Sequence, residues 1–197
     1  MLRVVLRRAT ASLSGAVFLC TGTVGAARCA WGQKIMTDAI DLPPVHREFM
    51  SPSANFVLTI SSDDHWATPM ARAALNSRRA GVQQIVWRQT LLNIKGPRRA
   101  MITDYGAVIL IDDWINSPSD HALSVLSAKG KTVATYSLDA LIAILNVPRR
   151  DVSSHATLGI WLSAEPTVSD DGATVRFRTA GRGLVLRVRD GRITLTK

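Results

Sequence analysis

An internal repeat constrains the fold of this chain more than any other feature of its sequence. The segment ANFVLTISSDD resembles YGAVILIDDW at a shift of 51 residues (108 − 57), which aligns Val57 with Val108. At the same shift Ile60 aligns with Ile111, and each copy has the pattern of a strand, a polar loop, a strand, a short turn and a strand. Repeats of this length with three or four strands are typical of propeller blades or a related meander.

A third, shortened copy is expected from Asp171 to the C-terminus. Here Leu184 and Leu186 alternate with residues of other types, which predicts a strand with one apolar face. Asp190 and Gly191 follow this strand and precede another one. They predict a two-residue hairpin turn in which both positions need a positive φ.

One helix is expected to interrupt the strands. Ser137 is placed to cap its N-terminus, and Asn146 and Pro148 are placed to end it. We therefore predict an all-β fold, mainly an antiparallel meander of two to three blade-like repeats, with one short helix near residues 138–146. A second short helix in PMARAALNS is an alternative, but the repeat favours a strand there.

The N-terminus has the pattern of a secretory signal peptide over residues 1–27. The basic start MLRVVLRR is followed by an uncharged segment of small and apolar residues, and no acidic residue precedes Asp38. The small residues Gly25 and Ala27 fit cleavage after Ala27. We expect an exported protein, periplasmic or secreted, and a mitochondrial presequence or a retained membrane anchor are the alternatives.

The rest of the chain is expected to hold one domain. The pair Pro43-Pro44 favours an extended backbone, so residues 28–54 are predicted to be a linker and residues 55–197 a single β-repeat domain. Cleavage after Ala27 would leave Cys29 as the one cysteine, which excludes a disulfide within the mature chain.

Several motifs also resemble a known group of proteins. SPSANFVLTISSDD resembles the Ser-Pro-Asp-Gly start of WD40-like propeller blades, although Ser53-Ala54 replaces Asp-Gly. TDYGAVILIDDW, VLSAKGKTVATYSLDALI and VPRRDVSSH together resemble an uncharacterised group of exported bacterial β-repeat proteins. The resemblance covers roughly residues 51–160. It implies an exported all-β module and no particular reaction.

Two pairs of aspartates are the candidates for catalysis. Asp63 and Asp64 follow one apolar strand, and Asp112 and Asp113 follow the next, with His65 beside the first pair. Equivalent loops of a repeat fold share a rim, so these carboxylates could converge for acid–base chemistry or for Ca²⁺. However, the sequence has neither the residue spacing of a calcium-binding loop nor that of a zinc site. In addition, neighbouring residues on a strand point to opposite faces of the sheet, which separates the two aspartates of a pair. We expect the aspartates to end strands and to bind the loop backbone, with no metal.

The C-terminal arginines are the candidates for binding, in a chain with a formal charge of +9. They are Arg176, Arg178, Arg187, Arg189 and Arg192. On alternating strands they would line one face and attract an anionic ligand. The alternative is a solvated face whose charges discourage edge pairing. Nucleic acid is not expected, because Phe177 is the one aromatic residue among them.

These patterns predict an exported, non-catalytic β-repeat module that acts by binding, without a cofactor. Its ligand is unknown, and an anionic ligand and another protein of the cell envelope are the candidate partners. One alternative is an exported hydrolase or metal-dependent enzyme that uses the paired aspartates. Another is a structural protein that oligomerises through an open sheet edge. Contact with a membrane is expected only through an uncleaved N-terminus.

Overall fold

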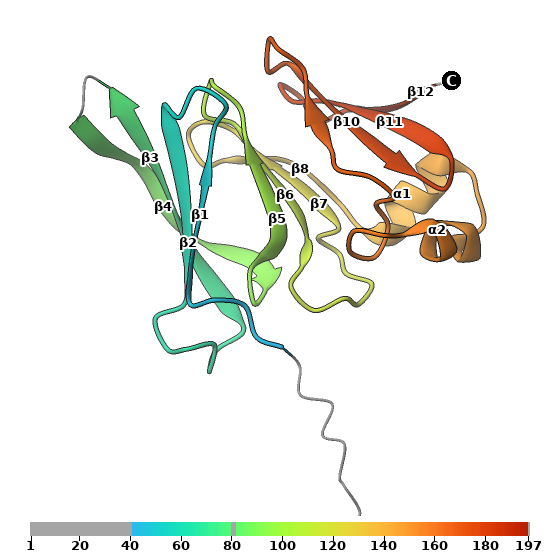
Figure 1. Cartoon of the computed structure of the whole chain (residues 1–197), viewed down its shortest axis with the longest axis horizontal. Helices are drawn as coiled ribbons and strands as arrows, with labels where there is room; N and C mark the ends of the chain where they lie inside the picture. The colour runs from blue at the N-terminus through green and yellow to red at the C-terminus, as the bar shows by residue number, and fades with distance from the viewer. Residues whose placement is uncertain (1–40, 80–81, 197) are drawn as a thin grey trace, which may run out of the picture. The chain divides into compact units, whose positions relative to one another are not determined.

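The computed structural model describes residues 41–79 and 82–196, which belong to one compact unit, Ala39–Lys197 (Figure 1). Its strands form three four-stranded antiparallel sheets, and in each sheet the spatial order of the strands follows their order in the sequence. This confirms the predicted antiparallel meanders. The expected signal peptide and the first part of the expected linker lie outside the described residues. Within the described residues, no helix is long and apolar enough to cross a membrane.

The first sheet begins before the boundary expected at residue 55. Its strands are β1 (His46–Met50), β2 (Phe56–Ser61), β3 (Met70–Arg79) and β4 (Val82–Ile94). Residues 46–50 were expected to be linker, but they pair with β2, for example Arg47 with Ile60. The segment PMARAALNS forms β3, as the repeat predicted, and not a helix.

The second sheet is buried on both faces. Its strands are β5 (Pro97–Ile102), β6 (Val108–Asp113), β7 (Leu123–Leu126) and β8 (Thr132–Tyr136). All six residues of β6 are buried. Val108 and Leu110 belong to the core shared with the first sheet, and Ile109 and Ile111 belong to the core shared with the third. Two buried faces explain why residues 108–111 of β6 are continuously apolar and do not alternate.

The third sheet confirms the shortened third repeat. Its strands are β9 (Thr167–Val168), β10 (Thr174–Thr179), β11 (Arg182–Arg187) and β12 (Ile193–Thr196). Leu184 and Leu186 are fully buried, as their alternation predicted, and Leu186 pairs with Ile193 across the expected hairpin.

The turn of that hairpin differs from the prediction. Gly191 has a positive φ of 71°, but Asp190 does not, and Arg187 N donates to Arg192 O across a four-residue connection. The two-residue turn with two positive φ values lies between β10 and β11 instead, at Ala180 and Gly181. The ion pair between Arg187 and Asp190 spans the wider connection and holds Asp190 in it.

Residues 41–79 and 82–196 contain two helices where one was predicted. α1 (Leu138–Leu145) begins after Ser137, whose Oγ accepts a hydrogen bond from Ala140 N at 3.1 Å, and it ends at Asn146 with φ 50°. α2 (Arg149–His155) follows directly. Pro148 ends the first helix, but its fixed φ also suits the start of the second, which is why α2 was missed.

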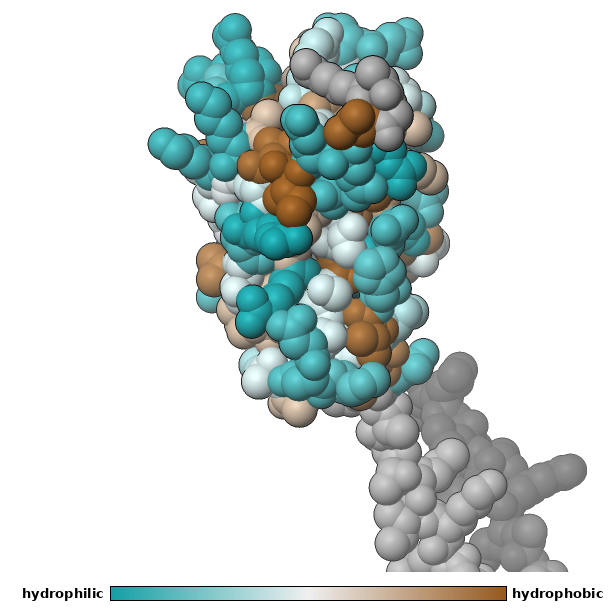
Figure 2. Space-filling model, turned by 90° about the vertical axis from the view of Figure 1, so that its left-hand side faces the viewer, coloured by the Kyte–Doolittle hydropathy of each residue, from teal (hydrophilic) through white to brown (hydrophobic). Residues whose placement is uncertain are grey.

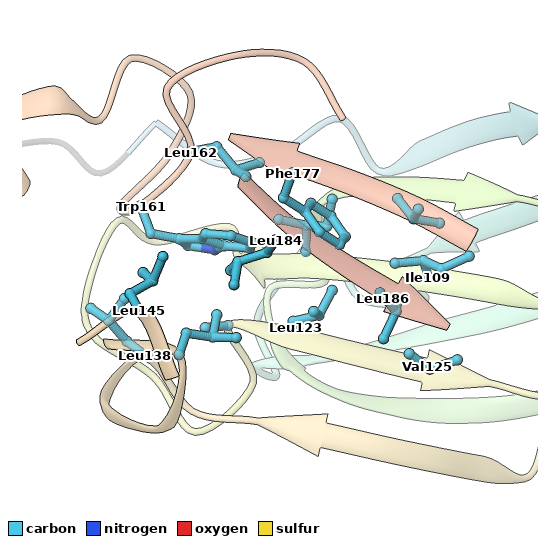
Figure 3. Close-up of a cluster of buried hydrophobic side chains, with 14 of the residues drawn as sticks. Ile109, Leu123, Val125, Leu138, Leu145, Trp161, Leu162, Phe177, Leu184 and Leu186 are labelled. Atoms are coloured by element: carbon cyan, nitrogen blue, oxygen red, sulfur yellow. The ribbon is translucent and has the colours of Figure 1, made fainter. Parts of the chain in front are cut away.

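Side chains from the second sheet, the third sheet and both helices form the larger core (Figure 3). Trp161 packs on Phe177 with ring centroids 5.4 Å apart, and Leu145 of α1 packs into the same cluster. The helices therefore complete the core that the short third sheet leaves open.

The turn between the first and second strand starts in the same way in all three sheets, but it is one residue shorter in the second sheet than in the other two. Each turn starts with a hydroxyl side chain, and that hydroxyl accepts a hydrogen bond from the backbone N–H where the second strand begins. The pairs are Phe56 with Ser51 at 3.2 Å, Ala107 with Thr103 at 3.1 Å and Thr174 with Ser169 at 3.0 Å. These contacts extend the repeat seen in the sequence to the third copy.

The position three residues after each hydroxyl residue has a positive φ. It is 57° at Ala54, 83° at Gly106 and 64° at Gly172. The first turn therefore forms even though alanine stands where glycine is favoured. Asp104 of the second turn joins it to the first, because Asp104 Oδ1 accepts hydrogen bonds from Ser53 N at 2.8 Å and from Ser53 Oγ at 2.6 Å.

Candidate functional site

The first aspartate pair is engaged by its own loop and strand. Asp63 forms an exposed ion pair with Arg72. Asp64 accepts hydrogen bonds from Thr68 N and Ser62 Oγ, each at 2.9 Å, and these bonds lower its pKa. His65 is exposed in the same loop, with φ 53°. These residues therefore hold the loop, as was expected for the strand ends.

The second pair is buried at the end of β6. Asp112 and Asp113 are each 2% exposed. Burial raises the pKa of Asp112 to about 7 and raises the pKa of Asp113. Asp113 Oδ1 accepts a hydrogen bond from Ile94 N at 3.1 Å, which fixes the end of β4.

Asp112 occupies an unusual position. Its φ is 55°, and its Oδ2 accepts a long hydrogen bond of 3.4 Å from Ile160 N. The hydrogen bond from Ile160 N lowers the pKa of Asp112, and the Trp161 side chain lowers it less. Burial raises this pKa by more than either contact lowers it. Asp112 Oδ1 and Trp161 Nε1 are nevertheless buried without a hydrogen-bond partner that meets normal distance and angle. A carboxyl in this position can hold a proton near neutral pH.

The two pairs have different partners, so the structure does not bring the four carboxylates into one site. Asp63 contacts Arg72, whereas Asp112 faces the loop at Gly159 and Ile160. Among the described residues, no group of three or more His, Cys, Asp or Glu side chains could hold a metal ion.

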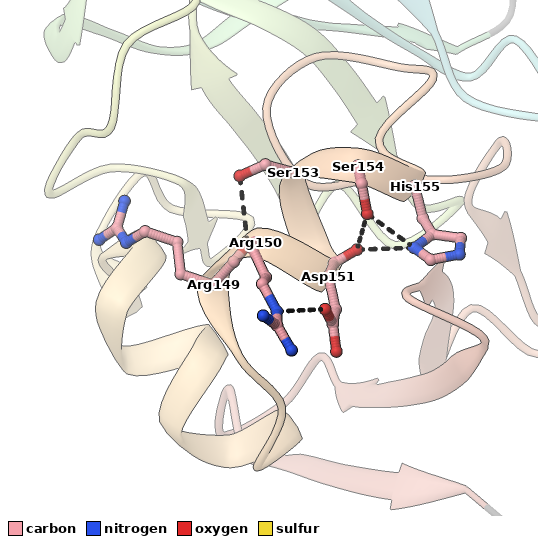
Figure 4. Close-up of polar contacts among 6 residues, drawn as sticks. All are labelled: Arg149, Arg150, Asp151, Ser153, Ser154 and His155. Carbon is pink, nitrogen blue, oxygen red and sulfur yellow. Dashed lines mark hydrogen bonds and ion pairs between the residues drawn. The ribbon is translucent and has the colours of Figure 1, made fainter. Parts of the chain in front are cut away.

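The serines and the histidine of α2 do not form a catalytic triad (Figure 4). His155 Nδ1 lies 2.8 Å from the carbonyl oxygen of Asp151, so that nitrogen must donate and cannot accept the proton of Ser154. The Asp151 carboxylate is 3.3 Å from Arg150 Nε and pairs with it. Ser153 Oγ donates to Arg149 O at 3.2 Å, one turn earlier in the helix. These polar contacts are local to the helix.

The C-terminal arginines do not share one site. Arg176 and Arg178 lie on the outward face of β10, where they line a broad hollow. Arg187 pairs with Asp190, with Nε 2.9 Å from Oδ1, and Arg189 lines a different hollow beside Tyr105. Arg192 is exposed in the connection to β12 and borders neither hollow.

Exposed apolar side chains gather on the first sheet. Strands β1 and β4 carry Met50, Val82, Ile85, Val86, Leu92 and Ile94, each of them at least 41% exposed. Seen from the side of β3 and β4, hydrophobic patches are separated by hydrophilic residues (Figure 2). Nothing in the described residues shows what covers these patches, so the oligomerising role stays a prediction.

A groove of about 460 Å³ combines the features that a binding site needs. Its walls are Phe49 from β1, Arg98 to Met101 from β5, Ile111 and Trp114 at β6, and Glu165 and Pro166 before β9. Apolar side chains and three charged ones, Arg98, Arg99 and Glu165, share the wall about equally. Ligand pockets of proteins usually combine apolar walls with a few charged or polar groups.

Two arginines stack on the same tryptophan at this groove. The guanidinium of Arg47 lies 4.9 Å from the ring centroid of Trp114, and that of Arg98 lies 5.5 Å from it. Trp114 Nε1 donates to Asp41 O at 2.6 Å, and Arg98 Nη1 donates to Trp114 O at 3.1 Å, which fix the ring and the guanidinium. Such stacking orients the guanidinium group and leaves its edge available.

Arg47 carries its charge in a partly buried position. Its Nη2 donates to Pro97 O at 2.8 Å, and its Nε is buried without a partner. Burial lowers the pKa of Arg47 to about 10, so it remains charged at neutral pH. Neither Arg47 nor Arg98 has an ion-pair partner among residues 41–79 and 82–196.

Arg99 is the arginine of the groove that already holds a carboxylate. Its Nη1 donates to both oxygens of Glu165, at 2.7 Å and 3.0 Å. Glu165 is 65% exposed, so this pair is open to solvent and can be displaced at small cost. The groove therefore has the donors to hold an anion.

The sequence predictions missed these groove residues, although a signal was present. HREFM also resembles PRRAM, and the structure makes Arg99 the counterpart of Arg47 (99 − 47 = 52), because Arg47 pairs with Ile60 and Arg99 pairs with Ile111. The signal was lost because residues 46–50 were expected to be linker. Trp114 was expected only to pack on the edge of a sheet.

Comparisons with known proteins add little to this geometry. No family model and no curated protein matches the chain. An oligogalacturonate lyase in complex with manganese is similar in structure, with a TM-score of 0.42 and 10% identity over 79% of this chain and 43% of the lyase chain. A europium-containing methanol dehydrogenase has a TM-score of 0.35 and 10% identity, covering 73% of this chain and 23% of its own. The chain thus spans less than half of either structure, and the resemblance to exported β-repeat proteins stays a prediction.

Proposed function

We propose that the chain is an exported, non-catalytic β-repeat module that binds a small anion with a flat apolar part in the groove of Trp114. The observation that carries the proposal is that Arg47 and Arg98 both stack on Trp114 without a carboxylate partner among the described residues. Export rests on the pattern of residues 1–27.

The electrostatics of the groove favour an anion. A charge that is partly removed from water is costly unless an opposite charge lies close to it. The guanidinium of Arg47 is in this state, as its lowered pKa indicates. Arg47 does not line the groove, so it would act on an anion there only through its charge, whereas Arg98 lines the groove and would bind the anion directly. A planar guanidinium can bind both oxygens of a carboxylate or phosphate.

The walls of the groove favour an apolar part next to the charge. Phe49 and Trp114 offer aromatic surface, and Met101 and Pro166 offer aliphatic surface. Burying apolar area contributes about 25 cal/mol per Å². A ligand with a ring and one anionic group would therefore use both the apolar walls and Arg98.

The test compares three probes by isothermal titration calorimetry of the full chain. We expect 1-naphthoate, which has a ring and a carboxylate, to bind more tightly than inorganic phosphate or 1-naphthalenemethanol. Arg98→Gln should weaken naphthoate binding about 10-fold, as expected for the loss of one charged hydrogen bond. Glu165→Gln should tighten it, because this change removes the carboxylate that competes for Arg99.

Arg88→Gln is the matched control. Arg88 is exposed on the first sheet, where it lines a different hollow, so this variant loses the same charge away from the groove. Naphthoate binding should not change in this variant. If Arg88→Gln and Arg98→Gln weaken binding equally, the anion is attracted only by net charge and the proposed site is wrong.

A further inference from the structure

We propose that the ligand of the groove carries a second carboxylate, which binds Arg178 on the third sheet. This inference rests on the proposed function and narrows its small anion to an aromatic dicarboxylate. It starts from the broad hollow over the outward face of β10, which has a volume of about 670 Å³. Glu165 lines this hollow and also lines the groove of Trp114, so the two spaces meet at this side chain.

Two backbone contacts hold Arg176 and Arg178 beside Glu165. Arg176 pairs with Thr167 in the third sheet, and the carbonyl oxygen of Arg178 accepts a hydrogen bond from Ser163 N at 2.9 Å. Glu165 lies midway between Ser163 and Thr167 in the chain. Opposite residues of paired strands have Cα atoms about 5 Å apart, and an arginine side chain is longer than that. Both guanidinium groups can therefore reach the boundary between the hollow and the groove.

The charges that border the two spaces do not balance. Arg98 and Arg99 line the groove, and Arg176 and Arg178 line the hollow. Among the described residues, Glu165 is the one acidic side chain that lines either space, and it pairs with Arg99. The other three arginines have no ion-pair partner in this part of the chain. A single carboxylate at Arg98 would leave the arginines of β10 without an anion, and a second carboxylate supplies one.

The two ends of this extended site differ in their exposure to water. Arg98 is half-buried and stacked on Trp114, whereas Arg176 and Arg178 are exposed. Ion pairs at exposed positions contribute little to affinity. The first carboxylate, at Arg98, should therefore supply most of the electrostatic binding energy. The second carboxylate should add a smaller gain that separates dicarboxylates from monocarboxylates of the same shape.

The test compares naphthalene-2,6-dicarboxylate with its monomethyl ester by isothermal titration calorimetry of the full chain. The ester keeps the rings and the length of the diacid and lacks one charge. We expect one diacid to bind per chain, about 5-fold more tightly than the ester. Arg178→Gln should reduce this advantage to less than about 2-fold and leave the affinity for the ester unchanged. Arg189→Gln is the matched control, because Arg189 is exposed beside the same sheet but lines a different hollow, and it should keep the full advantage.

Arg98→Gln separates a failure of this inference from a failure of the proposed function. It should weaken the binding of both probes about 10-fold, as it does for naphthoate. If both probes depend on Arg98 but the diacid has no advantage, keeps it in Arg178→Gln, or binds twice per chain, the second carboxylate site is wrong and the proposed function stands. An equal loss of the advantage in Arg189→Gln would also overturn the site, because net charge alone would explain it. If neither probe depends on Arg98, the groove is not the binding site and both proposals are wrong.

Discussion

Replacing Gly191 with alanine is expected to lower the free energy of unfolding by about 3 kcal/mol, the sum of a strained φ and an overpacked contact. The φ of Gly191 is 71°, and an added Cβ would lie 2.3 Å from Ala134 Cβ. Ala134 belongs to β8, so its methyl group cannot move unless the strand moves. Tyr136 of the same strand donates to Gly191 O at 2.8 Å, which holds the two segments together. Urea denaturation of both proteins measures the difference.

Gly181→Ala separates the two causes. Gly181 has nearly the same φ, 72°, but an added Cβ would meet nothing within 4 Å. This control should therefore lose only the backbone component, about 1–2 kcal/mol. Adding Ala134→Gly to Gly191→Ala should restore most of the stability lost through the contact. Equal losses in the two alanine variants would show that the third sheet does not pack against β8 in this way.

The second large effect is expected from Asp112→Asn, which should stabilise the protein at pH 8 and not at pH 4. The pKa of Asp112 rises from 3.8 to about 7 because the carboxyl is buried. The folded state thus holds the proton more tightly than the unfolded state. The resulting stability is fully present below pH 4, falls as the pH rises towards 7 and is gone above it.

The expected size follows from the same shift. One pKa unit corresponds to about 1.4 kcal/mol, so the stability that wild type loses between pH 4 and pH 8 is about 4 kcal/mol at most. Asparagine carries no charge, keeps an acceptor for Ile160 N, and tolerates the positive φ of this position. Thermal unfolding at both pH values measures the difference between variant and wild type.

Asp104→Asn is the control with the opposite sign. Hydrogen bonds from Ser53 lower the pKa of Asp104, so its ionised form stabilises the folded state. The Asp104→Asn substitution should therefore destabilise the protein at pH 8 and have less effect at pH 4. If Asp112→Asn changes Tm equally at pH 4 and pH 8, the carboxyl does not titrate in the way that its burial requires.

The repeat in the sequence predicted the fold because the apolar pattern of a strand is visible within a few neighbouring residues. Val57 and Val108 align, and the structure places them at equivalent positions of β2 and β6. Ser137 and Asn146 bound the first helix for the same reason, since caps are local hydrogen bonds. The second helix was missed because Pro148 was read only as a residue that stops the first helix. In the structure it also precedes the first residue of α2.

The candidate sites were harder to predict because they depend on which loops and sheet faces pack against one another in three dimensions. Asp112 was correctly expected to end a strand, but its burial depends on the loop at Gly159, far away in the sequence. The groove brings Phe49, Trp114 and Glu165 together from three parts of the chain. No spacing in the sequence predicts such contacts, although the shared position of Arg47 and Arg99 in the repeat was a partial signal.

The central claim is that the second sheet lies between the other two, because this arrangement builds the groove and brings Glu165 to it. Amide hydrogen exchange by NMR tests it directly, since buried core strands open only with global unfolding. The amides of β6, Val108 to Asp113, should exchange most slowly, whereas those of Val82 to Val86 in β4, where every residue is exposed, should exchange much faster. Fast exchange in β6, equal to that of Val82 to Val86, would contradict the account.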